Sequence, residues 1–416
     1  MDLRFVLGDS VSAFQPLRHR DFRLYFSGQT VSMVGTWMQT VAMAWMVHRL
    51  TGQPKWLGIV AFAGQGMAFL FSPLGGAAAD RFRVRNMVIL VQALLLIQAV
   101  CMAVLAWHPG AQVWQVVLLS MLLGALSAFD MTGRQVMVTR TVPQEDLPGA
   151  IALHSATFHG SRILGPALAG LVLATLGEGW CFLLNALSYL AALAALLSMH
   201  AGNENPGSGS GRSRADLLAG ARYIWLDRKV RLLLLFMGLV VLLGMPYTAL
   251  LPIFADTLLK AGAGGMGWIM GAGGVGATVG ALLLARRQGA PGIERIIVMA
   301  GFAFPIALTA FAFSRTLWLS ALLIGFVGLF LVTMNTGNQT LVQLSIPNHL
   351  RGRVLALYGM VFIGAMPLGA LWGGYAAQHI GATWTLVIGA VGCIFATLYF
   401  WIANRIHDRE AVNLPP

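Results

Sequence analysis

One arginine stands inside a long apolar stretch, HSATFHGSRILGPALAG, residues 154–170. Arg162 is the only charged residue between Asp146 and Glu178. If this stretch crosses a membrane as a helix starting near Ile151, Arg162 lies about 15–18 Å along it, near the middle of the bilayer. A charge at that depth is costly and is a candidate functional group. We expect Arg162 to bind an anionic group of a substrate or to couple to a proton site. The alternative is a structural ion pair with Asp130.

Two neighbours of Arg162 bear on its role. His159 lies one turn earlier, and a lone histidine in such a stretch is expected to be a hydrogen-bonded packing residue. Gly165 and Pro166 follow the arginine. Proline removes a donor and clashes with the preceding turn, so the helix is expected to kink here. The kink either contributes to coupling or has no coupling role.

Two polar stripes are candidates for the wall of a substrate cavity. The first consists of four residues at helical spacing with a tryptophan beside them: Gln29, Ser32, Thr36 and Gln39, with Trp37. The second has three residues on one face and two flanking asparagines: Thr336, Gln339 and Gln343, with Asn335 and Asn338. Such side chains can bind a substrate, or they can hydrogen-bond neighbouring helices.

Motifs of common catalytic and cofactor sites are missing from the sequence. There is no G-x-S-x-G elbow, no H-E-x-x-H and no pair of catalytic carboxylates, and no P-loop for a nucleotide. Cys101, Cys181 and Cys393 lie in apolar runs, without metal-ligand spacing or a disulfide framework. We therefore expect no metal, no cofactor and no ATP hydrolysis by this chain, and a membrane enzyme is a remote alternative.

Composition indicates which elements hold these residues. The chain has 416 residues, of which 57% are hydrophobic and 10% charged, whereas ordinary globular chains are about a quarter charged. So little charge cannot cover a soluble protein of this length, but lipid can surround it. Because lipid offers no partner to a free backbone group, we expect an all-α membrane protein.

Twelve apolar segments are each close to the roughly 20 residues that a helix needs to cross the hydrocarbon. They lie near 22–48, 56–79, 87–107, 113–133, 150–176, 180–199, 231–251, 263–285, 295–313, 317–341, 354–377 and 383–403. Twelve spans place both termini on one side of the membrane. Of the 27 Lys and Arg residues, 22 fall in the loops of one side and four in those of the other. Cytoplasmic loops carry the basic excess, so both termini are expected to be cytoplasmic. The net charge of +12 then reflects topology rather than nucleic-acid binding.

An internal repeat divides the chain into two six-helix halves. A shift of 204 residues aligns the fifth segment with the eleventh without a gap, matching for example Phe158 with Phe362 and Gly177 with Gly381. We expect halves at 1–199 and 231–416, joined by a cytoplasmic linker at 200–230. Parallel repeats of this kind are typical of secondary transporters, which bind substrate between the halves. Arg162 is matched with Met366, so the arginine breaks the symmetry.

The loop GGAAADRFRVR, residues 75–85, resembles the signature loop of the major facilitator superfamily. Four residues match the pattern: Gly76, Asp80, Arg81 and Arg85. Arg83 replaces the usual second glycine, and Val84 replaces an expected basic residue. Three other stretches are similar to the enterobactin-exporter-like branch, which also contains macrolide-efflux proteins. They are SMVGTWMQTVAMAW (32–45), AFDMTGRQVMVTRTVPQEDLPGAIAL (128–153) with RILGPALAG after it, and IPNHLRGRVLAL (346–357).

The resemblance spans nearly the whole chain and implies the major facilitator fold, with the first and tenth spans lining a central cavity. It also implies a gating role for the signature loop. Gly75 and Gly76 are small enough for helices to approach closely, and Asp80 and the arginines can form ion pairs or cap a helix end. The alternative is plain positive charge on a short loop. Gly165-Pro166 resembles part of a fifth-span antiporter motif, whose full glycine pattern is absent here.

These observations favour a secondary active transporter that exports an amphipathic small molecule, a siderophore or a drug, across the bacterial inner membrane by alternating access. The alternative is an importer or a lysophospholipid flippase of the same fold. The expected partners are the small-molecule substrate, a coupling proton (implied by the resemblance) and the lipid bilayer, with no nucleic acid. We expect a monomer.

Overall fold

The computed structural model describes residues 14–200, 214–286 and 292–412. Nearly all of these residues are helical, and no strand occurs among them. The chain forms two compact units. Unit 1 contains residues 1–50 and 66–211, and unit 2 contains residues 51–65 and 212–416. The predicted division at 1–199, 200–230 and 231–416 stays a prediction, and the compact units differ from it by grouping residues 51–65 and the helix at 214–226 with the C-terminal unit.

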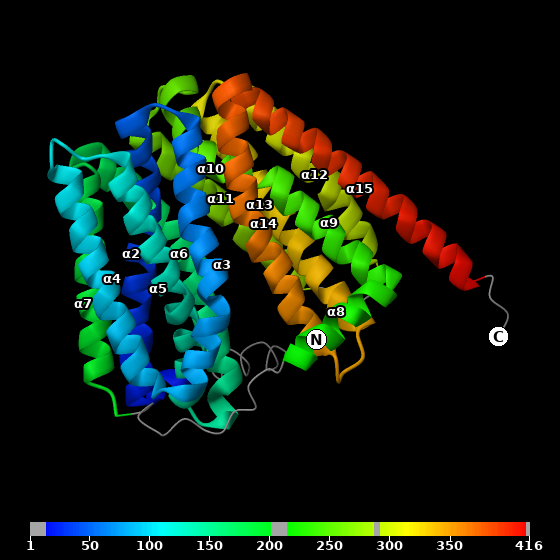
Figure 1. Ribbon diagram of the computed structural model, residues 1–416, viewed down its shortest axis with the longest axis horizontal. Coiled ribbons are helices and arrows are strands. Elements are labelled where there is room, and N and C mark those ends of the chain that lie inside the picture. Colours follow the sequence, from blue (N-terminus) through cyan, green and yellow to red (C-terminus); the bar gives the residue numbers. More distant parts are fainter. Residues whose placement is uncertain (1–13, 201–213, 287–291, 413–416) are drawn as a thin grey trace, which may run out of the picture. The chain divides into compact units, whose positions relative to one another are not determined.

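Unit 1 is a bundle of long helices that lie side by side (Figure 1). Its elements are η1 (Gln15–Arg18), α2 (Arg20–Thr51), the part of α3 (Pro54–Arg81) from Gly66 onward, α4 (Val84–Trp107), α5 (Val113–Arg140), η2 (Gln144–Asp146), α6 (Leu147–Thr175) and α7 (Glu178–Leu197). Large side chains such as Phe22, Tyr25 and Tyr189 are fully buried in its core.

Besides residues 51–65, which include the first part of α3, unit 2 contains the helices from α8 onward. Its elements are α8 (Arg214–Leu226), α9 (Arg228–Gly244), α10 (Pro246–Ile253), the π-helical segment η3 (Phe254–Leu258), α11 (Gly262–Ala285), α12 (Ile293–Phe313), α13 (Leu317–Ser345), α14 (Arg351–Ile380) and α15 (Ala382–Val412). Its core includes Phe236, Phe254, Phe304 and Phe311.

Ten helices of the described chain are long and apolar enough to span a membrane, where α9, α10 and η3 together count as one, Arg228–Leu258. Two more helices of unit 1, α2 with 32 residues and α6 with 29, have sufficient length. They are not among the ten because polar residues interrupt their apolar character. Twelve segments thus have the length predicted for spans, and ten also have the composition. The two polar helices are those that carry Arg162 and the first polar stripe.

Two glycines matched by the internal repeat adopt the same unusual backbone conformation. Gly177, between α6 and α7, has φ 90° and ψ 175°, and Gly381, between α14 and α15, has φ 82° and ψ 155°. Glycine reaches such positive φ values without steric cost, and other residues rarely do. The matched positions therefore have similar backbone conformations.

The seventh predicted segment, 231–251, is not one continuous helix. Met245 separates α9 from α10, which begins at Pro246, and α10 passes into the π-helical turn after Pro252. Each proline lacks the N–H that would continue the hydrogen-bond ladder. The hydropathy of the segment stays high throughout, so it does not predict these interruptions.

Candidate functional site

Arg162 lies at the centre of α6 and is half-buried. Its guanidinium carbon is 5.8 Å from the centre of the Trp37 ring on α2, a cation–π distance. Trp37 in turn packs edge-to-face on Phe158 of α6, with ring centres 6.2 Å apart. Among the described residues, no carboxylate forms an ion pair with Arg162. The arginine is therefore a partly accessible positive charge held against an aromatic ring.

Gly165 explains how α6 comes so close to α2 at this point. A Cβ added to Gly165 would overlap the Cβ of Trp37 and lie 3.0 Å from the backbone oxygen of Val34. Pro166 follows inside the helix, which continues to Thr175. Because proline has no N–H, the carbonyl of Arg162 loses its helical donor. The Gly-Pro pair thus places α6 against Trp37 and leaves the Arg162 carbonyl without its helical donor.

Asp130 pairs with Arg134 and not with Arg162. The two residues are one turn apart on α5, with 2.6 Å between Arg134 Nε and Asp130 Oδ2. Both are buried, at 7% and 6% exposure. The alternative interpretation of Arg162, a structural ion pair with Asp130, is therefore wrong. In addition, α5 runs on to Arg140, so Asp130 lies deeper inside its helix than the predicted segment 113–133 suggests.

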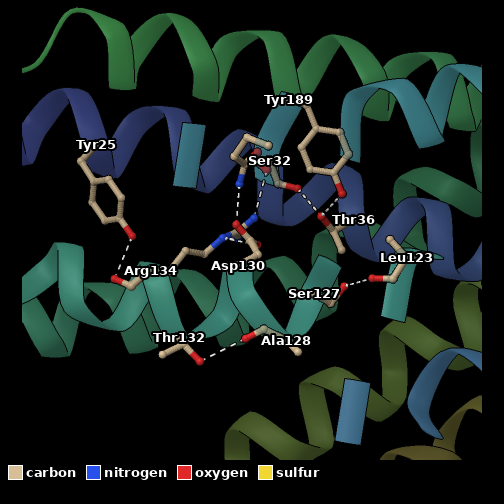
Figure 2. A network of polar contacts seen from close by, with 11 residues as sticks. Tyr25, Ser32, Thr36, Leu123, Ser127, Ala128, Asp130, Thr132, Arg134 and Tyr189 are labelled. Atoms are coloured by element: carbon tan, nitrogen blue, oxygen red, sulfur yellow. Dashed lines mark hydrogen bonds and ion pairs between the residues drawn. The ribbon is translucent and has the colours of Figure 1, made fainter. Parts of the chain in front are cut away.

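Neighbouring helices fix both members of this pair (Figure 2). Gln92 of α4 donates from Nε2 to Asp130 Oδ1 at 2.8 Å. On the α2 side, Arg134 Nη2 lies 3.4 Å from Ser32 Oγ, and the Tyr25 hydroxyl donates to the Arg134 carbonyl at 3.0 Å. A buried ion pair is tolerated when further hydrogen bonds satisfy its remaining donors and acceptors. This network provides such bonds from two neighbouring helices, α2 and α4.

The first polar stripe of α2 divides between two roles. Gln39 is 1% exposed and bonds two other helices, donating to Gln98 Oε1 at 2.9 Å and accepting from Asn185 Nδ2 at 2.6 Å. Thr36 is half-buried and lies 3.3 Å from the Tyr189 hydroxyl. Gln39 therefore takes part in the interhelical hydrogen bonding that was the alternative to cavity lining. Thr36 remains partly accessible, and so does Trp37, which lies next to Arg162.

Gln29 differs from the other members of the stripe. It is 2% exposed, and neither its amide nitrogen nor its amide oxygen has a hydrogen-bond partner in the described part of the chain. Its spacing puts it on the same face of α2 as Tyr25 and Ser32, which both contact Arg134. A buried amide of this kind is normally satisfied by protein or by an ordered water.

The stripe of α13, in unit 2, is divided in the same way. Asn338 is fully buried and donates to the Leu233 carbonyl at 3.0 Å. Asn335 Oδ1 accepts from the Tyr358 hydroxyl of α14 at 3.0 Å. Gln339 is exposed. Asn338 thus ties α13 to α9, whereas Gln339 is available to a ligand.

The signature loop connects α3 with α4. Gly75 packs on α5, since an added Cβ would lie 2.7 Å from the Ala128 carbonyl oxygen, whereas Gly76 has no atom within 4 Å of that position. The close approach expected of both glycines therefore occurs at Gly75 alone. Arg85 donates to the carbonyls of Leu196 and Leu197 at 3.0 and 3.1 Å, which caps the end of α7.

Asp80 and Arg81 are exposed. Neither forms an ion pair within the described part of unit 1. The gating role of the loop stays a prediction.

Sequence reasoning missed Arg134 and Gln92, which hold Asp130. The arginine had a usable signal, because residues four apart on a helix face the same side and an acid–base pair at that spacing is a candidate ion pair. Gln92 had no such signal, because its role depends on how α4 packs against α5. The described residues contain no group of three or more His, Cys, Asp or Glu side chains placed to hold a metal ion.

Comparison with known proteins agrees with this architecture. The family model described as "transmembrane secretion effector", MFS_3, matches residues 11–416. The chain is 25% identical over 384 residues to the staphyloferrin A transporter of Staphylococcus aureus, covering 92% of this chain and 96% of the relative. It is 26% identical over 391 residues to the multidrug efflux pump Tap of Mycolicibacterium fortuitum, covering 92% and 95%. It is also 25% identical over 384 residues to the enterobactin exporter EntS of Shigella boydii, covering 91% and 90%.

Solved structures share the fold at lower identity. The nucleoside transporter NupG superposes with a TM-score of 0.73 at 16% identity, covering 93% of this chain and 98% of that one. A bacterial homologue of ferroportin gives a TM-score of 0.71 at 17% identity, covering 92% and 98%. The family model matches residues 11–416, and the helical architecture, the internal repeat and the signature loop agree with it. The chain therefore belongs to the transmembrane secretion effector (MFS_3) family of major facilitator transporters.

Proposed function

We propose that the protein is a secondary exporter of an amphipathic, acidic small molecule such as a siderophore, or of a drug. The observation that carries the proposal is Arg162, a half-buried guanidinium in mid-helix with an aromatic partner, Trp37, and no carboxylate partner in the described chain. A fixed charge beside an indole ring suits a ligand that has both an anionic and a flat apolar part. Relatives named as an enterobactin exporter and a multidrug efflux pump support export as the direction, and the staphyloferrin A transporter supports a siderophore as the cargo.

In this proposal four residues of unit 1 have defined parts. Arg162 binds the anionic group, and Trp37 stacks on the cargo. Gly165 and Pro166 keep α6 against α2 and expose the carbonyl of Arg162 as an acceptor. Thr36 is a further candidate in unit 1 to contact the cargo. The protein works by alternating access in the bacterial inner membrane, with both termini cytoplasmic.

We assign proton coupling to the Asp130–Arg134 pair. Asp130 is a buried carboxylate with a 2.6 Å contact to the guanidinium of Arg134. Protonation of Asp130 removes the charge that compensates Arg134, and an uncompensated buried charge is strongly unfavourable. The protonated and deprotonated states therefore favour different arrangements of the helices around the pair. In proteoliposomes, a pH gradient should drive transport by the wild type, and transport by Asp130→Asn should not depend on the gradient. If the rate of wild-type transport is the same with and without the pH gradient, the assignment is wrong.

The exporter itself is tested by a screen followed by a transport assay. Purified protein is heated with a panel of acidic siderophores, uncharged siderophores and cationic drugs, and compounds that raise the melting temperature are loaded into proteoliposomes. We expect an acidic, aromatic or amphipathic compound to bind and to be moved by the protein. If cells lacking the protein accumulate that compound no more than wild-type cells do, export is the wrong direction.

The gating role of the signature loop is part of the same proposal. Asp80 is exposed in unit 1, so its replacement leaves packing intact. We expect Asp80→Asn to slow transport while the protein stays folded and membrane-inserted. Wild-type transport by this variant would leave the loop with a topological role alone.

A further inference from the structure

The short helix α8 ends where the first span of unit 2 begins. Asp227 alone separates Leu226, the last residue of α8, from Arg228, the first of the candidate span Arg228–Leu258. Asp227 caps α9 by accepting from the Val230 N–H at 3.0 Å. The Tyr223 hydroxyl donates to the other oxygen of Asp227 at 3.0 Å, and burial together with this carboxylate raises the pKa of the phenol, which keeps it a donor. The end of α8 is thus fixed at the surface of the membrane.

One face of α8 packs on protein. A Cβ added to Gly220 would lie 3.2 Å from both Arg353 Cβ and Leu357 Cδ1 of α14, so the two helices touch at this glycine. Trp225 and Leu226 are not covered by the protein, and 74% and 72% of their surfaces are exposed. Large apolar side chains at this level meet the boundary between headgroups and acyl chains, where tryptophan is enriched in membrane proteins.

The charges around this face are mostly positive. Two carboxylates near this surface are engaged: Asp227 caps α9, and Glu294 pairs with Lys229 at 2.6 Å. Arg222 is exposed, and no carboxylate of the described residues pairs with it. Arg231, one turn into α9, reaches back so that its guanidinium donates to the Trp225 carbonyl and lies 5.8 Å from the Trp225 ring.

We propose that Arg222, Trp225, Leu226 and Arg231, here called the linker-helix surface, bind an anionic phospholipid. Trp225 and Leu226 lie among the upper acyl carbons, and the two guanidinium groups bind the lipid phosphate. The combination of an amphipathic surface helix with aromatic and basic residues is the physical requirement for such a contact. Lipid binding would hold α8 at the membrane surface and, through Gly220, against α14. The proposal is independent of the cargo that the protein moves.

The test uses the full-length protein purified in detergent and native mass spectrometry with added phosphatidylglycerol or phosphatidylcholine. We expect wild-type protein to retain phosphatidylglycerol in preference to phosphatidylcholine. Arg222→Gln should weaken retention of phosphatidylglycerol roughly five-fold, the contribution of one interfacial arginine, and Arg222→Lys should largely preserve it. The matched control is Arg286→Gln, which removes one charge from an exposed arginine at the end of α11 and should retain phosphatidylglycerol as the wild type does.

A second measurement tests the position of the indole. The protein is reconstituted in phosphatidylglycerol vesicles whose acyl chains carry bromine near the headgroup, and tryptophan quenching is compared between wild type and Trp225→Phe. We expect the wild type to show an additional quenched component that the variant lacks. Three results would each overturn the proposal. Arg222→Gln could retain phosphatidylglycerol as well as the wild type does, or Arg286→Gln could lose as much of it as Arg222→Gln. The third is identical tryptophan quenching of wild type and Trp225→Phe.

Discussion

Two arginines of unit 1, Arg134 and Arg162, have opposite surroundings. Arg134 is buried and neutralised by Asp130 on its own helix. Arg162 is half-buried and faces an aromatic ring, Trp37. A buried ion pair is not a source of stability by itself, but removing one partner is costly because the other charge remains. The two arginines should therefore respond differently to mutation.

Asp130→Asn should lower the free energy of unfolding by about 3–5 kcal/mol, because Arg134 is left as an uncompensated buried charge. The double variant Asp130→Asn/Arg134→Gln should recover most of this loss, since it removes both charges. Denaturant unfolding in detergent, followed by tryptophan fluorescence, measures both effects. If the double variant loses as much free energy of unfolding as the two single variants lose together, the two residues are not coupled.

How far the residues of the site were predictable depends on whether their partners are close in sequence. Arg162 and Trp37 were both identified as candidates, one from its isolated charge and the other from its position in the polar stripe. Their contact was not predicted, because it depends on Gly165 allowing two helices to approach. The division of each stripe into buried and accessible members, such as Asn338 and Gln339, also depends on packing that spacing alone does not give.

At the scale of the helices, α11 and α13 of unit 2 approach each other closely at glycines. A Cβ added to Gly276 of α11 would overlap the carbonyl oxygen of Gly325 on α13, and one added to Gly328 would overlap that of Gly273. Small residues allow this kind of contact, which van der Waals packing stabilises where lipid gives no hydrophobic driving force between helices.

Gly276→Ala should therefore separate α11 from α13 and lower the melting temperature and the yield of folded protein. The control is Gly352→Ala on α14, where an added Cβ meets no atom within 4 Å; this change should be neutral or slightly stabilising, because alanine favours helix. Thermal unfolding monitored by size-exclusion chromatography compares the two. Equal melting temperatures for both variants would contradict the packing argument.

Helix positions were predictable because apolar runs of about 20 residues have one structural solution in lipid. Eleven of the twelve predicted segments each lie within one long helix, to within two residues, and the seventh is divided between α9 and α10. The interruption of the seventh at Met245 and its π-helical end at Phe254–Leu258 were not predicted, because Pro246 and Pro252 do not lower the apolar character of the segment. The less apolar composition of α2 and α6 is itself informative, since these helices carry the candidate cargo site.

For the molecule as a whole, the distribution of Lys and Arg predicts that both termini are cytoplasmic. Single cysteines should be introduced as Ser210→Cys and Ile380→Cys in a background without Cys101, Cys181 and Cys393, of which Cys101 is exposed. Position 210 lies outside the described residues and in the predicted linker, and position 380 ends α14. A membrane-impermeant thiol reagent should label them from opposite sides. Labelling of both from the cytoplasmic side would exclude the twelve-span topology.

The central claim is that Arg162 supplies the fixed positive charge of the cargo site. Transport of the best acidic and the best uncharged compound from the thermal-shift panel should be measured in proteoliposomes with wild type, Arg162→Lys and Arg162→Met. The methionine copies the repeat partner Met366 and removes a charge that no carboxylate of the described chain pairs with, so the fold should keep its stability.

We predict that Arg162→Met reduces transport of the acidic compound about 10- to 100-fold, the value of one charge-assisted hydrogen bond, and leaves the uncharged compound unaffected. Arg162→Lys should be intermediate, because it keeps the charge and loses the planar fork. Wild-type transport of the acidic compound by Arg162→Met, or a loss of stability as large as that of Asp130→Asn, would contradict the account.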